Sequence, residues 1–213
     1  MLYEYGNLIC LFFAMTMKGW FLWNSFEDGS IYVYNKKNKL KILKPFYVIW
    51  VIVYASHTVF VFYAINKNSE MTDKLTFYVL LLYFFDILYT FSLIRKKELV
   101  TFAMLIMQIY ILICIYVIYD IQYSRGITRA TIWIYYLPFS INLSWSAYLL
   151  AHNFLAIAVT QRFSEINELT ISIMFMLMLI IPTSFLLLYK NDVAYAAVHL
   201  ICLFGLWLQN SGK

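Results

Sequence analysis

One aspartate and three histidines lie inside long apolar runs, where a charge is costly and marks either a function or a structural pair. Asp86 lies near the middle of one run, and His57, His152 and His199 lie in three others. Asp86 could be a proton or ligand contact, or a buried carboxyl that holds one helix against another. His57 and His152 could ligate a b-type haem through neutral imidazoles, but core histidines bonded to neighbouring helices fit the same pattern.

Motifs of catalysis and metal binding are absent from the chain. The sequence contains no H-E-x-x-H, P-loop or C-x-x-C motif, and no nucleophile motif surrounds Ser140, Ser144 and Ser146. Hydroxyls four residues apart in a membrane helix more often serve close helix packing. The three cysteines are odd in number and widely spaced, which supports neither a disulfide framework nor a zinc site. We therefore expect a protein that is not an enzyme and that holds no metal.

The composition places these side chains in a membrane protein. Of the 213 residues, 63% are hydrophobic, 20% are aromatic and 13% are charged, and the mean hydropathy is +0.74. Soluble domains are about 45–50% apolar and about 25% charged, so this chain has too little polar surface for a water-soluble globule of its size. The same composition excludes a disordered chain and a nucleic-acid-binding tail protein. We therefore expect the protein to contact the lipid bilayer. The sequence shows no cleavable targeting signal.

Seven apolar runs are long enough, or nearly so, to cross a hydrocarbon core of ~30 Å as helices. The runs cover Leu8–Trp23, Phe46–Ile65, Leu75–Ile94, Val100–Tyr119, Ala130–Val159, Leu169–Tyr189 and Ala194–Leu208. The first is short and contains Lys18, whose ammonium we expect to snorkel to the headgroups. If this run lies on the interface, the number of spans is six. The fifth run, with 30 residues, predicts tilt or a break at Pro138, and Pro182 predicts a kink in the sixth.

Basic residues predict the orientation in the membrane. With seven spans, ten lysines and arginines fall on one side and five on the other. Because loops on the cytoplasmic side keep the excess of positive charge, the Lys-rich loop 24–44 and the C-terminus are expected in the cytoplasm, or in the matrix of a mitochondrion.

An aromatic motif opens the second run. Phe46, Trp50 and Tyr54 form F-x-x-x-W-x-x-x-Y directly after Pro45, which places three large rings on one helical face, as a flat hydrophobic ligand would need. The motif resembles the second helix of the TspO or translocator protein family (tryptophan-rich sensory protein, peripheral benzodiazepine receptor). That helix opens with Pro and then F-x-x-x-W-x-x-L-Y.

The fifth run carries a second match. Leu137-Pro138-Phe139, then Trp145 and then Asn153 are similar to the pattern on the last core helix of the same family. The third run departs from the family. Asp86 and Tyr89 stand where the family has the Asn and the Trp of an L-N-x-x-W motif. The loop before the second run also departs, being rich in Lys rather than in Pro and Trp.

The apolar runs predict an all-α membrane protein, a polytopic bundle of six to seven transmembrane helices, and the resemblance covers the first five of them. One membrane-embedded domain would cover residues 1–213, with a five-helix TspO-like core over 8–160 and two additional C-terminal helices over 169–208. The implied function is non-enzymatic binding of a tetrapyrrole, haem included, or a sterol, at the mouth of the bundle, often as a homodimer. The residues that would line the site are Trp50, Tyr54, Asp86, Tyr89, Trp145 and Asn153.

Other interpretations stay open on the sequence alone. Trp50 and Tyr54 could belong to an interfacial aromatic belt, with Trp145 and Asn153 in helix packing. The chain could be an accessory structural subunit of a large mitochondrial membrane complex, of the respiratory chain or an ATP synthase. Its many Phe, Tyr, Met, Asn and Lys residues are typical of an AT-rich genome, which fits a mitochondrial location. A small transporter with Asp86 as its proton site is a third possibility.

Overall fold

A computed structural model describes residues 2–27, 48–66, 70–123, 129–160 and 168–211. These residues form seven α helices and no strand, which confirms the all-α bundle. The helices are α1 (Leu2–Glu27), α2 (Val48–Asn66), α3 (Glu70–Ile94), α4 (Glu98–Tyr123), α5 (Arg129–Thr160), α6 (Glu168–Lys190) and α7 (Val193–Ser211). Pro45, Phe46 and most of the Lys-rich loop lie outside the described residues.

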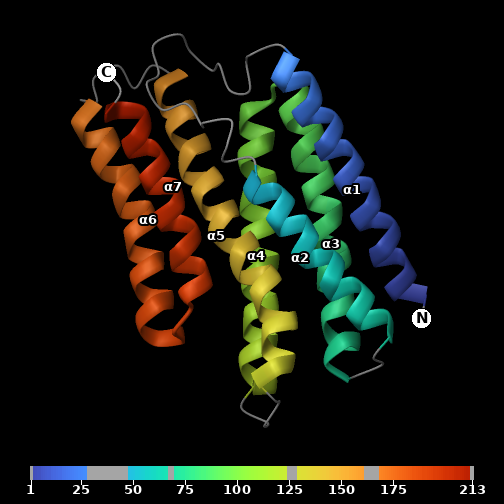
Figure 1. Cartoon of the computed structure of the whole chain (residues 1–213). Helices are drawn as coiled ribbons and strands as arrows, with labels where there is room; N and C mark the ends of the chain where they lie inside the picture. The colour runs from blue at the N-terminus through green and yellow to red at the C-terminus, as the bar shows by residue number, and fades with distance from the viewer. Residues whose placement is uncertain (1, 28–47, 67–69, 124–128, 161–167, 212–213) are drawn as a thin grey trace.

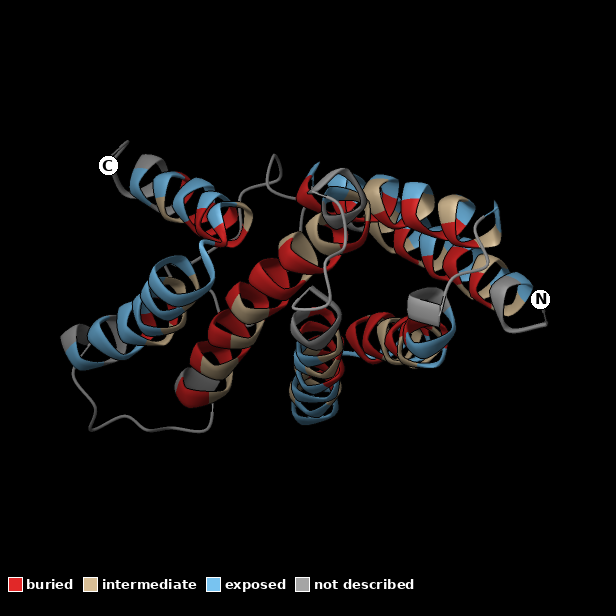
Figure 2. Cartoon of the chain, turned by 90° about the horizontal axis from the view of Figure 1, so that it is seen from below, coloured by how far each residue is buried: buried red, intermediate tan, exposed pale blue. Residues whose placement is uncertain are grey.

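The helices run alternately up and down, and α5 lies at the centre of the packing (Figure 1). α3 packs against α1 and α4, while α5 contacts α2, α4, α6 and α7. Figure 2 shows that buried residues follow α5 along most of its length, whereas α6 is mostly exposed. The first five helices therefore form the core of the bundle, and α6 and α7 attach to it through α5.

Among the described residues, five helices contain segments that are long and apolar enough to cross a membrane. The segments are Tyr5–Asn24, Val48–Asn66, Asp73–Ile94, Glu98–Tyr119 and Ile173–Lys190. α5 is long enough, but its serines, Asn142 and its tyrosines lower its hydropathy, and α7 contributes the shorter apolar segment Val193–Gly205. Because α5 is surrounded by other helices, its polar groups find protein partners instead of lipid.

The two membrane prolines lie inside continuous helices. α5 contains Pro138 and extends over 32 residues, about 48 Å at the rise of an α-helix. A break at Pro138, which the sequence offered as an alternative to tilt, is therefore not observed. α6 likewise continues through Pro182 over 23 residues. Neighbouring helices can satisfy the backbone carbonyl that a proline frees, which is why a membrane helix tolerates this residue.

A tight turn joins α3 to α4. Lys96 adopts a left-handed conformation, with φ of 54°, and its N–H donates to the Leu93 carbonyl at 3.0 Å. The N–H of Lys97 donates to the Ser92 carbonyl at 3.0 Å, which completes the pattern of a Schellman cap. The hydroxyls of Ser92 and Thr101 lie 2.9 Å apart across the turn. These bonds hold α3 and α4 antiparallel, in the arrangement that places Gln108 of α4 beside Asp86 of α3.

Candidate functional site

Asp86 on α3 is the meeting point of four helices. Its Oδ1 atom lies 3.1 Å from Lys18 Nζ on α1 and accepts a hydrogen bond from Gln108 Nε2 on α4 at 3.2 Å. The hydroxyl of Tyr54 on α2 donates to the other carboxylate oxygen. The carboxylate is thus paired and hydrogen-bonded, as a charge at membrane depth requires. This geometry supports the interpretation that Asp86 holds helices together.

The side chain of Lys18 is directed into the bundle. It is 2% exposed, so the expectation that it snorkels to the headgroups is wrong. Its ammonium lies 4.6 Å from the ring centroid of Trp50 and 4.5 Å from that of Tyr89. An ammonium over the faces of two aromatic rings is stabilised by their quadrupoles, and the carboxylate of Asp86 neutralises its charge. The ammonium of Lys18 pairs inside the bundle and does not reach the headgroups, because α3 offers the carboxylate of Asp86 at the same depth.

The two tryptophans of the sequence motifs meet on the other side of this ion pair. The ring centroids of Trp50 and Trp145 lie 5.7 Å apart with an angle of 87° between the ring planes. Trp145 also stacks on Tyr148, with an interplanar angle of 18°. Trp50 and Tyr54 are 4% and 8% exposed, so they belong to the interior and not to an interfacial belt.

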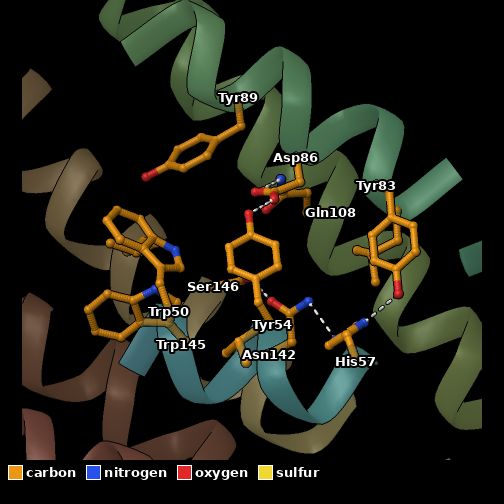
Figure 3. Close-up of a pocket in the computed structure, with 13 residues that line it drawn as sticks. Trp50, Tyr54, His57, Tyr83, Asp86, Tyr89, Gln108, Asn142, Trp145 and Ser146 are labelled. Carbon is orange, nitrogen blue, oxygen red and sulfur yellow. Dashed lines mark hydrogen bonds between the residues drawn. The ribbon is translucent and has the colours of Figure 1, made fainter. Parts of the chain in front are cut away.

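A cavity of about 20 Å³ lies between these side chains, with room for a molecule the size of water (Figure 3). All its walls come from α2, α3, α4 and α5, and Lys18 of α1 contacts three of the residues that line it. The walls consist of Trp50, Val53, Tyr54, His57, Leu82, Tyr83, Asp86, Tyr89, Gln108, Asn142, Trp145, Ser146 and Leu149. The indole N–H of Trp145 is buried and has no hydrogen-bond partner among the described residues.

His57 joins the walls of the cavity through both ring nitrogens. Its Nδ1 lies 3.0 Å from the hydroxyl of Tyr83, and its Nε2 lies 3.3 Å from Nδ2 of Asn142 (Figure 3). Because both nitrogens have protein partners, this arrangement does not favour haem ligation by His57 with His152. His152 does not line the cavity, and its ring lies beside Tyr148.

Five of the six predicted site residues lie around this one cavity: Trp50, Tyr54, Asp86, Tyr89 and Trp145. The sixth, Asn153, is not part of the lining. Its side chain is buried and donates to the carbonyl of Leu149 one turn earlier on α5, at 3.4 Å. The structure thus brings together residues from three separate helices, and whether they bind a ligand stays a prediction.

Several lining or neighbouring residues were not predicted as part of a site. Gln108 interrupts the apolar run Met107-Gln108-Ile109, and a polar residue at this depth is a signal that sequence reasoning can use. Asn142 lies within the serine-rich part of α5, where the amide is equally unusual. Lys18 was recognised as unusual, but its partner could not be identified from the sequence, since Asp86 lies 68 residues away.

A second polar cluster attaches the α6–α7 hairpin to the core. Asp192 is buried at the start of α7 and accepts the backbone N–H of Tyr195 at 2.9 Å, which caps this helix. The same carboxylate accepts hydrogen bonds from Ser140 Oγ on α5, at 2.6 Å, and from the hydroxyl of Tyr116 on α4. The preceding residue, Asn191, takes a left-handed conformation with φ of 52°. The cluster is structural, because its groups satisfy one another.

Polar contacts between α5 and the α6–α7 hairpin continue one turn further along α5. Ser144 Oγ donates to the Tyr195 carbonyl at 2.8 Å and lies 3.1 Å from His199 Nδ1. Thr183 Oγ1 of α6 lies 3.0 Å from the same ring nitrogen. Ser140 and Ser144 therefore serve helix packing, as their spacing predicts. Within the described parts of the chain, no group of three His, Cys, Asp or Glu side chains could hold a metal ion.

Comparisons with known proteins identify the family. The family model described as TSPO-like protein matches residues 4–213, and the match includes the two C-terminal helices that the sequence motifs left out. No curated protein and no solved structure gives a match. Together with the apolar helices, the family match shows that this is an integral membrane protein in contact with the lipid bilayer. The chain belongs to the TSPO-like protein family.

Proposed function

We propose that this membrane protein binds a flat hydrophobic ligand, a tetrapyrrole or a sterol, without catalysing a reaction on it. The observation that carries the proposal is the convergence of Trp50, Tyr54, Asp86, Tyr89 and Trp145 on one cavity. Apolar and aromatic walls with a few polar groups are typical of sites for small hydrophobic molecules. The ligand class is the one that the resemblance to the TspO or translocator protein family implies, and the family match supports that resemblance.

An unpartnered donor supports a ligand or water at this place. Trp145 lines the cavity and its buried indole N–H has no partner among the described residues, and a buried polar group without a partner calls for an explanation. The cavity itself, at about 20 Å³, is far smaller than the ~300–1,000 Å³ of ordinary ligand pockets. Binding a flat ring system therefore requires the aromatic walls of the cavity to move apart.

The test is a binding titration with the full chain in detergent micelles. Protoporphyrin IX and cholesterol are titrated separately, with protein-free micelles as the blank. We expect saturable binding of one or both, and a loss of at least about tenfold in affinity for Trp50→Ala, since the ring forms a wall of the site. Trp207→Ala is the matched control, because Trp207 is 60% exposed on α7. Absence of saturable binding of both compounds would contradict the proposal.

An accessory role in a large mitochondrial membrane complex is the second candidate. α6 presents a wide apolar face, with Ile173, Leu177, Ile180 and Leu188 exposed, which another subunit could cover in place of lipid. Extraction from native membranes in a mild detergent, followed by a native gel with immunodetection, separates the two functions. Migration with a megadalton complex favours the accessory role, and migration as a monomer or dimer favours ligand binding.

A further inference from the structure

The two charged groups at the cavity neutralise each other. Asp86 is the only carboxylate among the described lining residues, and its Oδ1 lies 3.1 Å from Lys18 Nζ. The other titratable side chain with two polar partners, His57, contacts the uncharged groups of Tyr83 and Asn142. The lining together with Lys18 therefore contains one positive and one negative group, in direct contact.

A charged ligand group would disturb this balance. Lys18 is 2% exposed and Asp86 is 18% exposed at the side chain, so water screens the pair little. An entering carboxylate could pair with Lys18 only by taking it from Asp86, and an entering ammonium could pair with Asp86 only by displacing Lys18. Either exchange leaves one buried charge without its partner, which is strongly unfavourable.

We propose that the Lys18–Asp86 ion pair makes the cavity selective for uncharged ligands, and that these two residues determine which ligand charge is accepted. The inference rests on the proposed function, because it concerns the ligand of the same site. It deepens that function by separating uncharged ring compounds from ionised ones. Neither residue needs to contact the flat body of the ligand for this selection to operate.

The surroundings of Lys18 make the effect of each substitution distinct. In Lys18→Met, the carboxylate of Asp86 and the ring faces of Trp50 and Tyr89 remain, an arrangement that suits an ammonium group. In Asp86→Asn, the ammonium of Lys18 remains without its carboxylate, which suits an anionic group. The two single variants are therefore expected to change the charge preference in opposite directions.

The experiment compares charged and uncharged forms of two ring scaffolds on the full chain in detergent micelles. The sterol series is cholesterol, cholesterol sulfate and the 3-amino analogue. The porphyrin series is the dimethyl ester of protoporphyrin IX, the free diacid, and its diamide with ethylenediamine, which carries terminal ammonium groups. Binding to protein-free micelles is subtracted for every compound, because charge alters partitioning into the detergent.

The wild-type protein is expected to bind the uncharged form at least about tenfold more tightly than either charged form. Lys18→Met is expected to prefer the cationic form and Asp86→Asn the anionic form. The double variant, with no charge left at the site, returns to the uncharged form. Lys97→Met is the matched control, because it removes a positive charge at the exposed α3–α4 turn and is expected to keep the uncharged preference.

The outcomes separate the two proposals. If no form of either scaffold binds, the proposed function fails and the charge selection fails with it. If the wild-type protein binds charged and uncharged forms equally, or if both single variants keep the wild-type order, only the charge selection is overturned. If one single variant does not fold, the other single variant decides together with the wild-type ranking, because each single variant is expected to change the charge preference.

Discussion

The edge of one indole meets the face of the other where Trp50 of α2 contacts Trp145 of α5, at 5.7 Å between ring centroids. Each tryptophan belongs to one of the two sequence motifs, which lie far apart in the sequence and meet only in the folded bundle. Both side chains are buried, so the contact is internal and independent of the membrane interface. Edge-to-face pairs add about 0.5–1.5 kcal/mol beyond burial, and this one closes one side of the cavity.

Trp145→Phe tests the unpartnered indole N–H. The substitution removes the donor and keeps an aromatic ring, so affinity for cholesterol is expected to fall by about two- to tenfold, the range of one net hydrogen bond. Affinity for cholestene, which lacks the hydroxyl, is expected to stay unchanged. Fluorescence titration in micelles measures both, with Trp207→Phe on the exposed surface as control. An equal loss for both compounds would show that the ring, and not the N–H, is responsible.

Breaking the buried ion pair is expected to destabilise the bundle. Asp86→Asn leaves the ammonium of Lys18 unpaired and costs on the order of 3 kcal/mol in free energy of unfolding. Lys18→Met costs less, because the Asp86 side chain is 18% exposed and keeps Tyr54 and Gln108 as donors, whereas Lys18 is 2% exposed.

A double-mutant cycle measures the coupling of this pair. Thermal unfolding in detergent is followed for the wild type, the two single variants and Lys18→Met/Asp86→Asn. The double variant is expected to cost less than the sum of the single ones by about 2 kcal/mol. Lys97→Met at the exposed α3–α4 turn is the control. Additive effects would show that the two groups do not interact in the folded protein.

Asp192→Ala is expected to loosen the α6–α7 hairpin. It removes the cap of α7 and the acceptor for Ser140 and Tyr116, at a cost of about 2–4 kcal/mol. Hydrogen–deuterium exchange should become faster in α6 and α7, while α3 keeps its protection. Asp73→Ala, at an exposed position of α3, is the control and should change neither region. Unchanged exchange in the hairpin would mean that apolar packing alone attaches it to α5.

The orientation predicted from basic residues can be measured at two turns. The α3–α4 turn with Lys97 and the α6–α7 turn next to Lys190 lie at opposite ends of the bundle (Figure 1). With the native cysteines replaced, Lys97→Cys should be protected from a membrane-impermeant maleimide in sealed vesicles of native orientation, and Lys190→Cys should react. The reverse pattern would contradict the orientation predicted from positive charge.

Helix positions follow from the sequence because spanning a bilayer requires long apolar runs. The run Leu75–Ile94 lies within α3 and the run Ala130–Val159 lies within α5, which extends one residue further at each end. Chain neighbours determine such runs, so no tertiary information is needed. Continuity at Pro138 was not predictable, since it depends on the helices that surround α5.

The sequence by itself determined the family resemblance, the apolar helices and five of the residues that now line one cavity. Only the tertiary structure decided that Lys18 is directed inward to Asp86, that Gln108 joins them, and that Asn153 lies outside the lining. The physical reason is that side-chain pairing between helices depends on their relative rotation and depth. Those quantities are set by packing over the whole bundle and not by residues close in the chain.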